Sequence, residues 1–270
     1  MKIQTLMEDN ISGENLCAEH GLCIYIETGN HKLLVDTGQS DRTWDNAKTK
    51  GINLEEIDTV VLSHGHYDHA GGLKSFLEIN DKAQIYIHKN AKREFYSFKK
   101  DKSHYIGMDS LLYSSPRIHW IDYDFKMDEI YVFGNEAHEI YWPKSNLRLK
   151  YKVKDKYIQD SFDHEIYVVI QNKVLLSGCA HNGIVNIMDE FQRRFKKDPE
   201  IVISGFHMIQ SQYMDEDIQC IQDIAKDLKS RNSNYYTGHC TGEFAYSILK
   251  KYLNSQIHYM KTGSSIEIKD

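Results

Sequence analysis

The sequence is poor in the residues that build linkers, disulfide frameworks and membrane anchors. It has three prolines and no low-complexity segment in 270 residues, which argues against long linkers and disordered tails. No stretch approaches the ~20 apolar residues of a membrane-spanning helix, and the first residues lack the apolar run of a signal peptide. The five cysteines are an odd number, and none forms a C-x-x-C pair. We therefore expect a cytoplasmic protein without disulfides and without a membrane partner.

Basic residues are not in excess either, since the net charge is −6. A surface that binds nucleic acid normally needs a basic excess, so nucleic acid is not an expected partner. The sequence also lacks a G-x-S-x-G motif, which gives no support for a covalent serine mechanism. The overall composition, with 41% hydrophobic and 27% charged residues, is ordinary for a globular domain.

Hydrophobic periodicity predicts the same succession of elements in both halves of the chain. In the first half, strands are predicted at 22–27, 32–36, 57–62 and 84–87, and helices at 41–50 and 70–80. In the second half, strands are predicted at 165–170, 173–177, 201–204, 234–237 and 265–268, and helices at 184–195, at 215–229 and from Gly242. Residues 89–160 are weakly patterned, with strands at 117–121 and 129–133, and are interpreted as an insertion or lid-like region. Strand pairs followed by strand–helix units, twice over, predict one α/β domain over residues 1–270, with two sheets packed face to face and helices outside.

Histidines follow four of these strands, each with a glycine close by. The four segments are Ser63-His64-Gly65, Gly178-Cys179-Ala180-His181, Gly205-Phe206-His207 and Gly238-His239. Strand ends gather at one edge of a sheet, and the loops there carry the chemistry of many enzymes. One such histidine is usually just a satisfied polar residue, but four of them predict a shared site.

The first of these segments continues as His64-Gly65-His66-Tyr67-Asp68-His69. In a loop, His64 and His66 can share one metal ion, while Asp68 and His69 reach a second one. Imidazole and carboxylate are ligands that zinc, iron and manganese accept. Two ions about 3.5–4 Å apart would lower the pKa of a shared water and stabilise attacking and leaving oxygens. The simpler alternative is a solvated polar loop.

This run resembles the H-x-H-x-D-H signature of the metallo-β-lactamase superfamily. Four longer segments resemble its branch labelled dihydropterin ribofuranosylaminobenzene-phosphate synthase, namely residues 33–39, 62–73, 177–186 and 237–243. The resemblance implies the four-layer αββα sandwich of that superfamily and a dinuclear site. It implies that the first metal is bound by His64, His66 and His181. It implies that the second metal is bound by Asp68, His69 and His239.

The chain departs from the wider superfamily at the bridging aspartate, for which no equivalent stands near Cys179. Either Cys179 supplies a thiolate near the metals, or the bridge is water and His181 takes the nearby ligand position. We favour the second interpretation, because a buried cysteine is most often a small hydrophobic residue. The same holds for Cys240. Other candidates near the site are Asp36, which resembles a carboxylate that orients a ligand, and His164, which we rank behind His181. His20 is either a residue at the rim of the site or an ordinary loop histidine.

The resemblance favours hydrolysis of a small-molecule substrate, with a metal-bound hydroxide attacking an acyl or phosphoryl centre. Asp68 or a bound water would handle the proton. His207 would contact the substrate or a metal, although a core position for His207 is equally compatible with the sequence. Two divalent ions are expected, zinc first, with manganese or iron as alternatives. Candidate substrates are esters, lactones, thioesters and phosphoesters, a phosphorylated pterin precursor among them. The rival hypotheses are an iron-dependent redox enzyme and a non-catalytic, metal-dependent ligand sensor. The sequence does not predict an oligomeric state.

Overall fold

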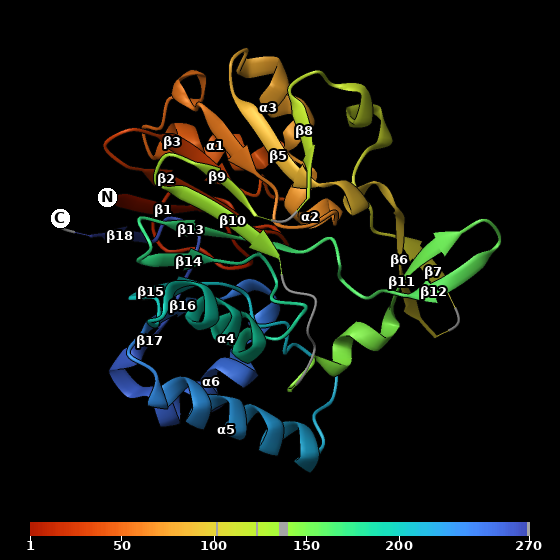
Figure 1. Ribbon diagram of the computed structural model, residues 1–270, viewed down its shortest axis with the longest axis vertical. Helices are drawn as coiled ribbons and strands as arrows, with labels where there is room; N and C mark the ends of the chain where they lie inside the picture. Colours follow the sequence, from red (N-terminus) through yellow and green to blue (C-terminus); the bar gives the residue numbers. More distant parts are fainter. Residues whose placement is uncertain (101, 123, 135–139, 269–270) are drawn as a thin grey trace. The chain divides into compact units, whose positions relative to one another are not determined.

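The computed structural model describes residues 1–100, 102–122, 124–134 and 140–268 (Figure 1). Contacts along the chain divide it into two compact units. Unit 1 comprises Met1–Asp122, Lys150–Ile158 and Met260–Asp270, and unit 2 comprises Tyr123–Leu149 and Gln159–Tyr259. The single domain expected from the sequence stays a prediction.

Unit 1 is built on a seven-stranded mixed sheet. Its strands, in spatial order, are β18 (Ser265–Glu267), β1 (Lys2–Met7), β2 (Cys23–Glu27), β3 (Lys32–Val35), β4 (Thr59–Val61), β5 (Gln84–His88) and β8 (Ile118–Ile121). β2 and β3 form the predicted antiparallel hairpin, and β3, β4, β5 and β8 run parallel. The sequence did not predict β1, which pairs with β2 on one side and with β18, near the other end of the chain, on the other. The parallel order brings the loops after β3 and β4 to the same edge.

The helices of unit 1 cover this sheet with apolar faces. They are α1 (Arg42–Thr49), α2 (Tyr67–Ala70) and α3 (Leu73–Ile79), with short 3₁₀ turns η1 (Leu54–Glu56), η2 (Lys89–Lys92) and η3 (Ser110–Ser114). Trp44 of α1 and Phe76 of α3 are buried and in ring contact at 5.5 Å, in a cluster that includes side chains from β4 and β5. Burying such a side chain contributes about 1.5–3 kcal/mol, so this cluster anchors both helices.

The helix predicted at 70–80 is confirmed as α3, but it begins later than predicted, because the chain breaks between α2 and α3 at Gly71-Gly72. A Cβ atom on Gly71 would lie 2.0 Å from the carbonyl oxygen of Gln39, and one on Gly72 would lie 2.2 Å from that of Thr37. Only glycine permits such a close backbone approach. The two glycines therefore let the loop after β3 pack against the histidine run.

The weakly patterned region divides among three sheets. Besides β8, it supplies a small sheet in the order β12 (Lys156–Gln159), β11 (Leu149–Val153), β6 (Glu94–Lys99) and β7 (Lys102–Tyr105). It also supplies β9 (Phe125–Met127) and β10 (Ile130–Gly134) to the sheet of unit 2. The predicted strands at 117–121 and 129–133 are confirmed as β8 and β10.

Unit 2 is built on a second seven-stranded sheet. Its order is β17 (Ile257–Tyr259), β16 (Asn234–Thr237), β15 (Ile201–Ile203), β14 (Val174–Leu176), β13 (Ile166–Ile170), β10 and β9. β13 and β14 form the predicted hairpin, and β14 to β17 run parallel. The repeated rhythm of a hairpin followed by parallel strands is thus confirmed.

Three helices of unit 2, α4 (Ile184–Phe195), α5 (Asp215–Ser230) and α6 (Glu243–Leu253), lie together beside this sheet in Figure 1. Their apolar faces join β13 to β17 in one buried cluster that contains Val185, Phe191, Leu228 and Leu249. The short turns η4 (Lys144–Arg148), η5 (His239–Thr241) and η6 (Asn254–Gln256) complete the unit. In the part of the chain that the structure describes, no helix has both the length and the apolar character needed to cross a bilayer.

Candidate metal centre

In unit 1, a buried carboxylate connects the ends of β3 and β4. Asp36 directly follows β3, and its Oδ1 accepts a hydrogen bond of 2.7 Å from the Ser63 N–H, while its Oδ2 accepts one of 2.8 Å from the Ser63 hydroxyl. Asp36 has φ of +62°, a left-handed conformation that costs a non-glycine residue roughly 1–3 kcal/mol. The surrounding hydrogen bonds hold it in that conformation.

The same carboxylate orients two histidines of the run. Nδ1 of His69 lies 2.6 Å from Asp36 Oδ2, and Nδ1 of His64 lies 2.9 Å from Ser63 Oγ. Because the only hydroxyl hydrogen of Ser63 goes to Asp36, its oxygen accepts from the His64 Nδ1–H. We assign both imidazoles the Nδ1-protonated tautomer on this network. A histidine held in this way binds a metal through Nε2. The prediction that Asp36 orients a histidine is confirmed.

The imidazoles of the run cluster together inside unit 1. The ring centroid of His64 lies 4.5 Å from that of His66 and 4.2 Å from that of His69. Asp68 stands at the edge of this group, with its Oδ2 3.8 Å from His69 Nε2 and 3.4 Å from His20 Nε2. His20 is thus the rim residue that the sequence suggested. Three imidazoles and one carboxylate, all of them less than a tenth exposed, form a donor set suited to divalent metals.

In unit 2, three neighbouring parallel strands end in the other predicted histidines. β14 leads to His181, β15 to His207 and β16 to His239, so the parallel order brings their loops to one edge. The ring centroids of His181 and His207 are 4.1 Å apart. His207 and His239 both have φ of +49°, and Ala180 has φ of +51°. Such strained turns concentrate at functional sites, and they direct side chains away from the path that a regular strand would give them.

His181 is held on three sides within unit 2. Its Nδ1 lies 2.9 Å from Asn146 Oδ1, and its carbonyl oxygen accepts a hydrogen bond of 2.7 Å from the same amide. The ring of Phe162 stacks on it at 4.2 Å with an interplanar angle of 6°. Asn146 was not predicted, because it lies in the weakly patterned region without a local motif.

A buried acid fixes the backbone beneath His181. Glu165 accepts hydrogen bonds from the backbone N–H groups of His181, at 2.7 Å, and Asn182, at 3.0 Å, and a third of 2.8 Å from the Tyr167 hydroxyl. Burial raises the pKa of Glu165, although these hydrogen bonds act in the opposite direction. His164, the alternative ligand, is buried beside Asp160, with 3.3 Å between Nε2 and Oδ2. Its rank behind His181 stays a prediction.

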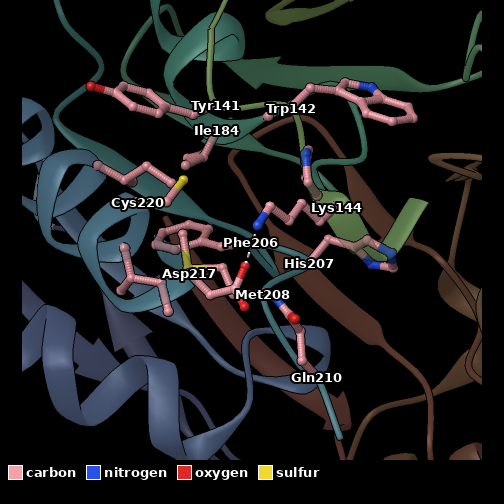
Figure 2. A pocket seen from close by; sticks show the side chains of 14 residues that line it. Tyr141, Trp142, Lys144, Ile184, Phe206, His207, Met208, Gln210, Asp217 and Cys220 are labelled. Atoms are coloured by element: carbon pink, nitrogen blue, oxygen red, sulfur yellow. Dashed lines mark ion pairs between the residues drawn. The ribbon is translucent and has the colours of Figure 1, made fainter. Parts of the chain in front are cut away.

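A pocket opens in unit 2 beside His207 (Figure 2). It encloses about 480 Å³ of empty space, its solvent-open part included, and its lining is mostly apolar. Phe206 and Met208 form part of the wall, and Lys144 reaches across to Asp217 in an ion pair of 2.9 Å. The Lys144 ammonium, together with the Met214 N–H, holds the pKa of Asp217 below its usual range. An apolar pocket with few polar groups is typical of small-molecule sites.

Comparisons with known proteins agree with this geometry. The sequence model of the metallo-beta-lactamase superfamily matches residues 18–145. The crystal structure of Tm1679, described as a metal-dependent hydrolase of the beta-lactamase superfamily, has 28% sequence identity and a TM-score of 0.84 over 100% of both chains. A 7,8-dihydropterin-6-methyl-4-(beta-D-ribofuranosyl)-aminobenzene-5'-phosphate synthase from Methanocaldococcus jannaschii is 28% identical over 99% of this chain and 96% of its own length. The uncharacterized protein MJ0448 of the same organism is 29% identical over 88% of this chain and 90% of its own length.

Two mixed sheets with flanking helices and buried histidine clusters at strand ends define a metal-dependent enzyme of the α/β class. The chain belongs to the metallo-beta-lactamase superfamily. The predicted αββα fold class and the predicted enzyme class, a metal-dependent hydrolase of this superfamily, are confirmed.

Proposed function

We propose that this enzyme hydrolyses a small ester, lactone or phosphoester with a dinuclear zinc centre. The proposed first metal is bound by His64, His66 and His181. The proposed second metal is bound by Asp68, His69 and His239. The support for each proposed ligand comes from contacts within its own unit.

One observation carries this proposal, namely that hydrogen bonds at Nδ1 preset the predicted ligands. Asp36 holds His69 directly and His64 through Ser63, and Asn146 holds His181. Such bonds fix the ring and its tautomer and raise the basicity of the other nitrogen, as outer hydrogen bonds do around metal ligands. A solvated polar loop has no need of a buried carboxylate in this position.

When bound, the metals would supply Lewis acidity, which lowers the pKa of a coordinated water and polarises the electrophile. The residues of the chain itself accept the proton and contact the substrate. Asp68 lies at the edge of the histidine cluster and beside His20, a position from which its carboxylate accepts a proton from the attacking water. His207 lines the pocket and lies against His181, so a substrate held in the pocket contacts its imidazole.

Zinc is the first candidate because imidazole and carboxylate ligands suit it, and manganese and iron accept the same donors. The M. jannaschii synthase is named for a phosphorylated dihydropterin-aminobenzene compound, so the substrate list includes phosphorylated pterin precursors. A fold hosts many reactions, so that substrate rests on likeness alone.

The test is turnover by chelator-stripped protein reloaded with zinc, manganese or iron(II), on a panel of esters, lactones, phosphoesters and a phosphorylated pterin precursor. We expect turnover that depends on metal and falls at least about 100-fold in Asp68→Asn, since proton transfer contributes roughly 10²–10⁴-fold. Asp9→Asn, which changes a carboxylate next to His20, is the matched control. Loaded protein that turns over none of these substrates would refute the proposed function.

A further inference from the structure

We propose that the pocket beside His207 binds an uncharged aromatic ring, and that charged groups of a ligand stay outside it. The residues that line this pocket all belong to unit 2 (Figure 2). The identification of this ring as part of the substrate rests on the proposed function, whereas the binding of the ring does not. The candidate substrates are thereby narrowed to compounds in which an aromatic ring adjoins the scissile bond.

One wall of the pocket is a single face of α5. Cys220, Ile221 and Ile224 line it, together with Asp217 in the first turn, and these positions have the spacing of one helical face. Ile184, in the first turn of α4, adds another aliphatic side chain. This wall thus offers mostly apolar surface, with one carboxylate at its end.

Aromatic side chains form much of the remaining lining. Tyr141 and Trp142 come from the segment before η4, while Phe206 and Met208 come from the loop after β15. An aromatic ring makes favourable offset or edge-to-face contacts with another ring, and a methionine sulfur also contacts ring edges favourably. Because the lining offers both kinds of contact, it suits an aromatic ring better than a flexible alkyl chain.

Hydrogen bonds hold the segment that carries the two aromatic residues. The Asn186 side chain of α4 accepts from the Ile140 N–H at 3.1 Å and donates to the Ile140 carbonyl oxygen at 2.6 Å. Further along, the Ser145 hydroxyl donates 2.8 Å to the carbonyl oxygen of His207. The segment is thus anchored at both ends within unit 2, so the wall is formed before a ligand binds. Preformed apolar pockets are the usual form of small-molecule sites.

The charged side chains of the lining are engaged with each other. The Lys144 ammonium lies 2.9 Å from an Asp217 carboxylate oxygen, a contact drawn as a dashed line in Figure 2, and 2.6 Å from Glu216. Two carboxylates around one ammonium sum to a negative charge, which does not attract a phosphate or another anion. A cation would have to leave water for a mostly apolar lining, where Asp217 already accepts from Lys144 and from the Met214 N–H. An uncharged ring avoids both costs.

The pocket extends to the histidines of the proposed centre. His207 belongs to its lining, and the ring centroid of His207 lies 4.1 Å from that of His181, a proposed metal ligand. A group attached directly to the bound ring therefore lies next to these histidines, where an ester or phosphoester bond would be cleaved. A phosphate on such a substrate lies on the side of the histidines and not in the pocket.

The experiment compares four ligands by NMR of protein with carbon-13 in its methionine methyl groups. Methyl 2-naphthyl sulfone and naphthalene-2-sulfonate have nearly the same shape and differ in charge. The other two are (2-naphthylmethyl)trimethylammonium, which is a cation, and methyl octyl sulfone, which has a chain in place of the ring. None of the four binds metals readily, so their affinities report on the pocket. Met208→Leu identifies the signal of Met208.

We expect the naphthyl sulfone to shift the Met208 signal in a saturable titration. Both charged ligands should bind at least about tenfold more weakly, because burying an unpaired charge is costly. The octyl sulfone should bind about two- to tenfold more weakly, since contacts between rings add to the burial of apolar area. A charged ligand or an octyl sulfone that binds as tightly as the naphthyl sulfone would overturn the proposal, as would a Met208 signal that the naphthyl sulfone does not shift.

A substitution that fills the pocket adds a second test. Cys220→Phe extends a half-buried side chain of α5 into the pocket and should weaken binding of the naphthyl sulfone at least about tenfold, because the ring is no longer fully buried. Ile218→Phe, at a half-buried position of the same helix outside the lining, is the matched control and should bind like the wild type. Unchanged binding in folded Cys220→Phe would also overturn the proposal.

The Met208 signal is measured in the unmutated protein, so the outcome does not depend on the folding of Cys220→Phe. No step requires turnover either. Failure of ring binding would therefore leave the proposed hydrolysis standing, and absence of turnover would leave the ring-binding pocket standing.

Discussion

Replacing one carboxylate oxygen in Asp36→Asn should change the tautomer of two histidines at once. The carbonyl oxygen of the new amide can still accept from the Ser63 N–H, which places the amide nitrogen where Oδ2 now accepts from Ser63 Oγ and His69 Nδ1. An amide N–H donates to both, so Ser63 must turn its hydrogen toward His64 Nδ1. Both imidazoles then carry their proton on Nε2, the nitrogen through which each would bind a metal.

The expected loss follows from this rearrangement. Outer hydrogen-bond partners of metal ligands are typically worth about 10–100-fold in affinity, or about 1.4–2.8 kcal/mol at each site. Asparagine has nearly the same shape as aspartate and keeps one acceptor in place. The unfolding free energy of the metal-free protein should therefore change by less than about 2 kcal/mol. Affinity should fall without a comparable loss of fold.

A competition titration with a chromophoric chelator measures the affinity for zinc. Asp58→Asn is the matched control, since Asp58 also holds a histidine of unit 1, with 3.0 Å between its Oδ1 and His31 Nδ1, and accepts from the Lys32 N–H at 2.8 Å. It should leave zinc affinity unchanged. Equal affinity of Asp36→Asn and the wild type would refute the assignment of the two tautomers and the role of Asp36.

Two further predictions concern stability. Phe191→Ala, in the fully buried face of α4, should lower the unfolding free energy measured by chemical denaturation by about 3–5 kcal/mol. The control Phe244→Ala, at a position 46% exposed, should lower it by less than about 1 kcal/mol. Equal losses would contradict the core described for unit 2. Because Lys144 holds the pKa of Asp217 below its unfolded value, the charged pair stabilises the fold above that value and loses its effect as the pH falls through the folded pKa. The difference in unfolding free energy between the wild type and Lys144→Met should therefore be constant above about pH 5 and shrink below about pH 4. A difference that stays constant down to about pH 2 would contradict this prediction.

The sequence was sufficient to predict the strands that carry the site, because each is a short apolar run followed by a glycine and a histidine. β4, β14, β15 and β16 all appear where the periodicity placed them. Since parallel strands end at one edge, the grouping of His181 and His207 within unit 2 followed from the same pattern. That Asp36 orients a histidine was likewise expected, from its resemblance to a carboxylate with that role, and the structure shows that the histidine is His69.

Other features leave no local signal in a sequence. β1 depends on pairing with β18, near the opposite end of the chain, and no periodicity records such a partner. Asn146 reaches His181 across 35 positions from a region without clear pattern. The break at Gly71-Gly72 arises from the approach of another loop, which helical periodicity does not report. Similarly, no local pattern shows that the fold brings Cys240 next to Cys179 and His207.

Metal content tests the central claim most directly. We would determine zinc, manganese and iron by elemental analysis in protein purified without added metal, in the wild type, in His64→Ala/His66→Ala, and in His119→Ala/His258→Ala, which alters two exposed histidines. The account predicts that the first double variant carries at least about one equivalent less metal than the wild type, because His64 and His66 are ligands of the first proposed ion, and that the second variant matches the wild type. Metal near zero in the wild type, or unchanged in the first double variant, would contradict a dinuclear centre on the histidine run.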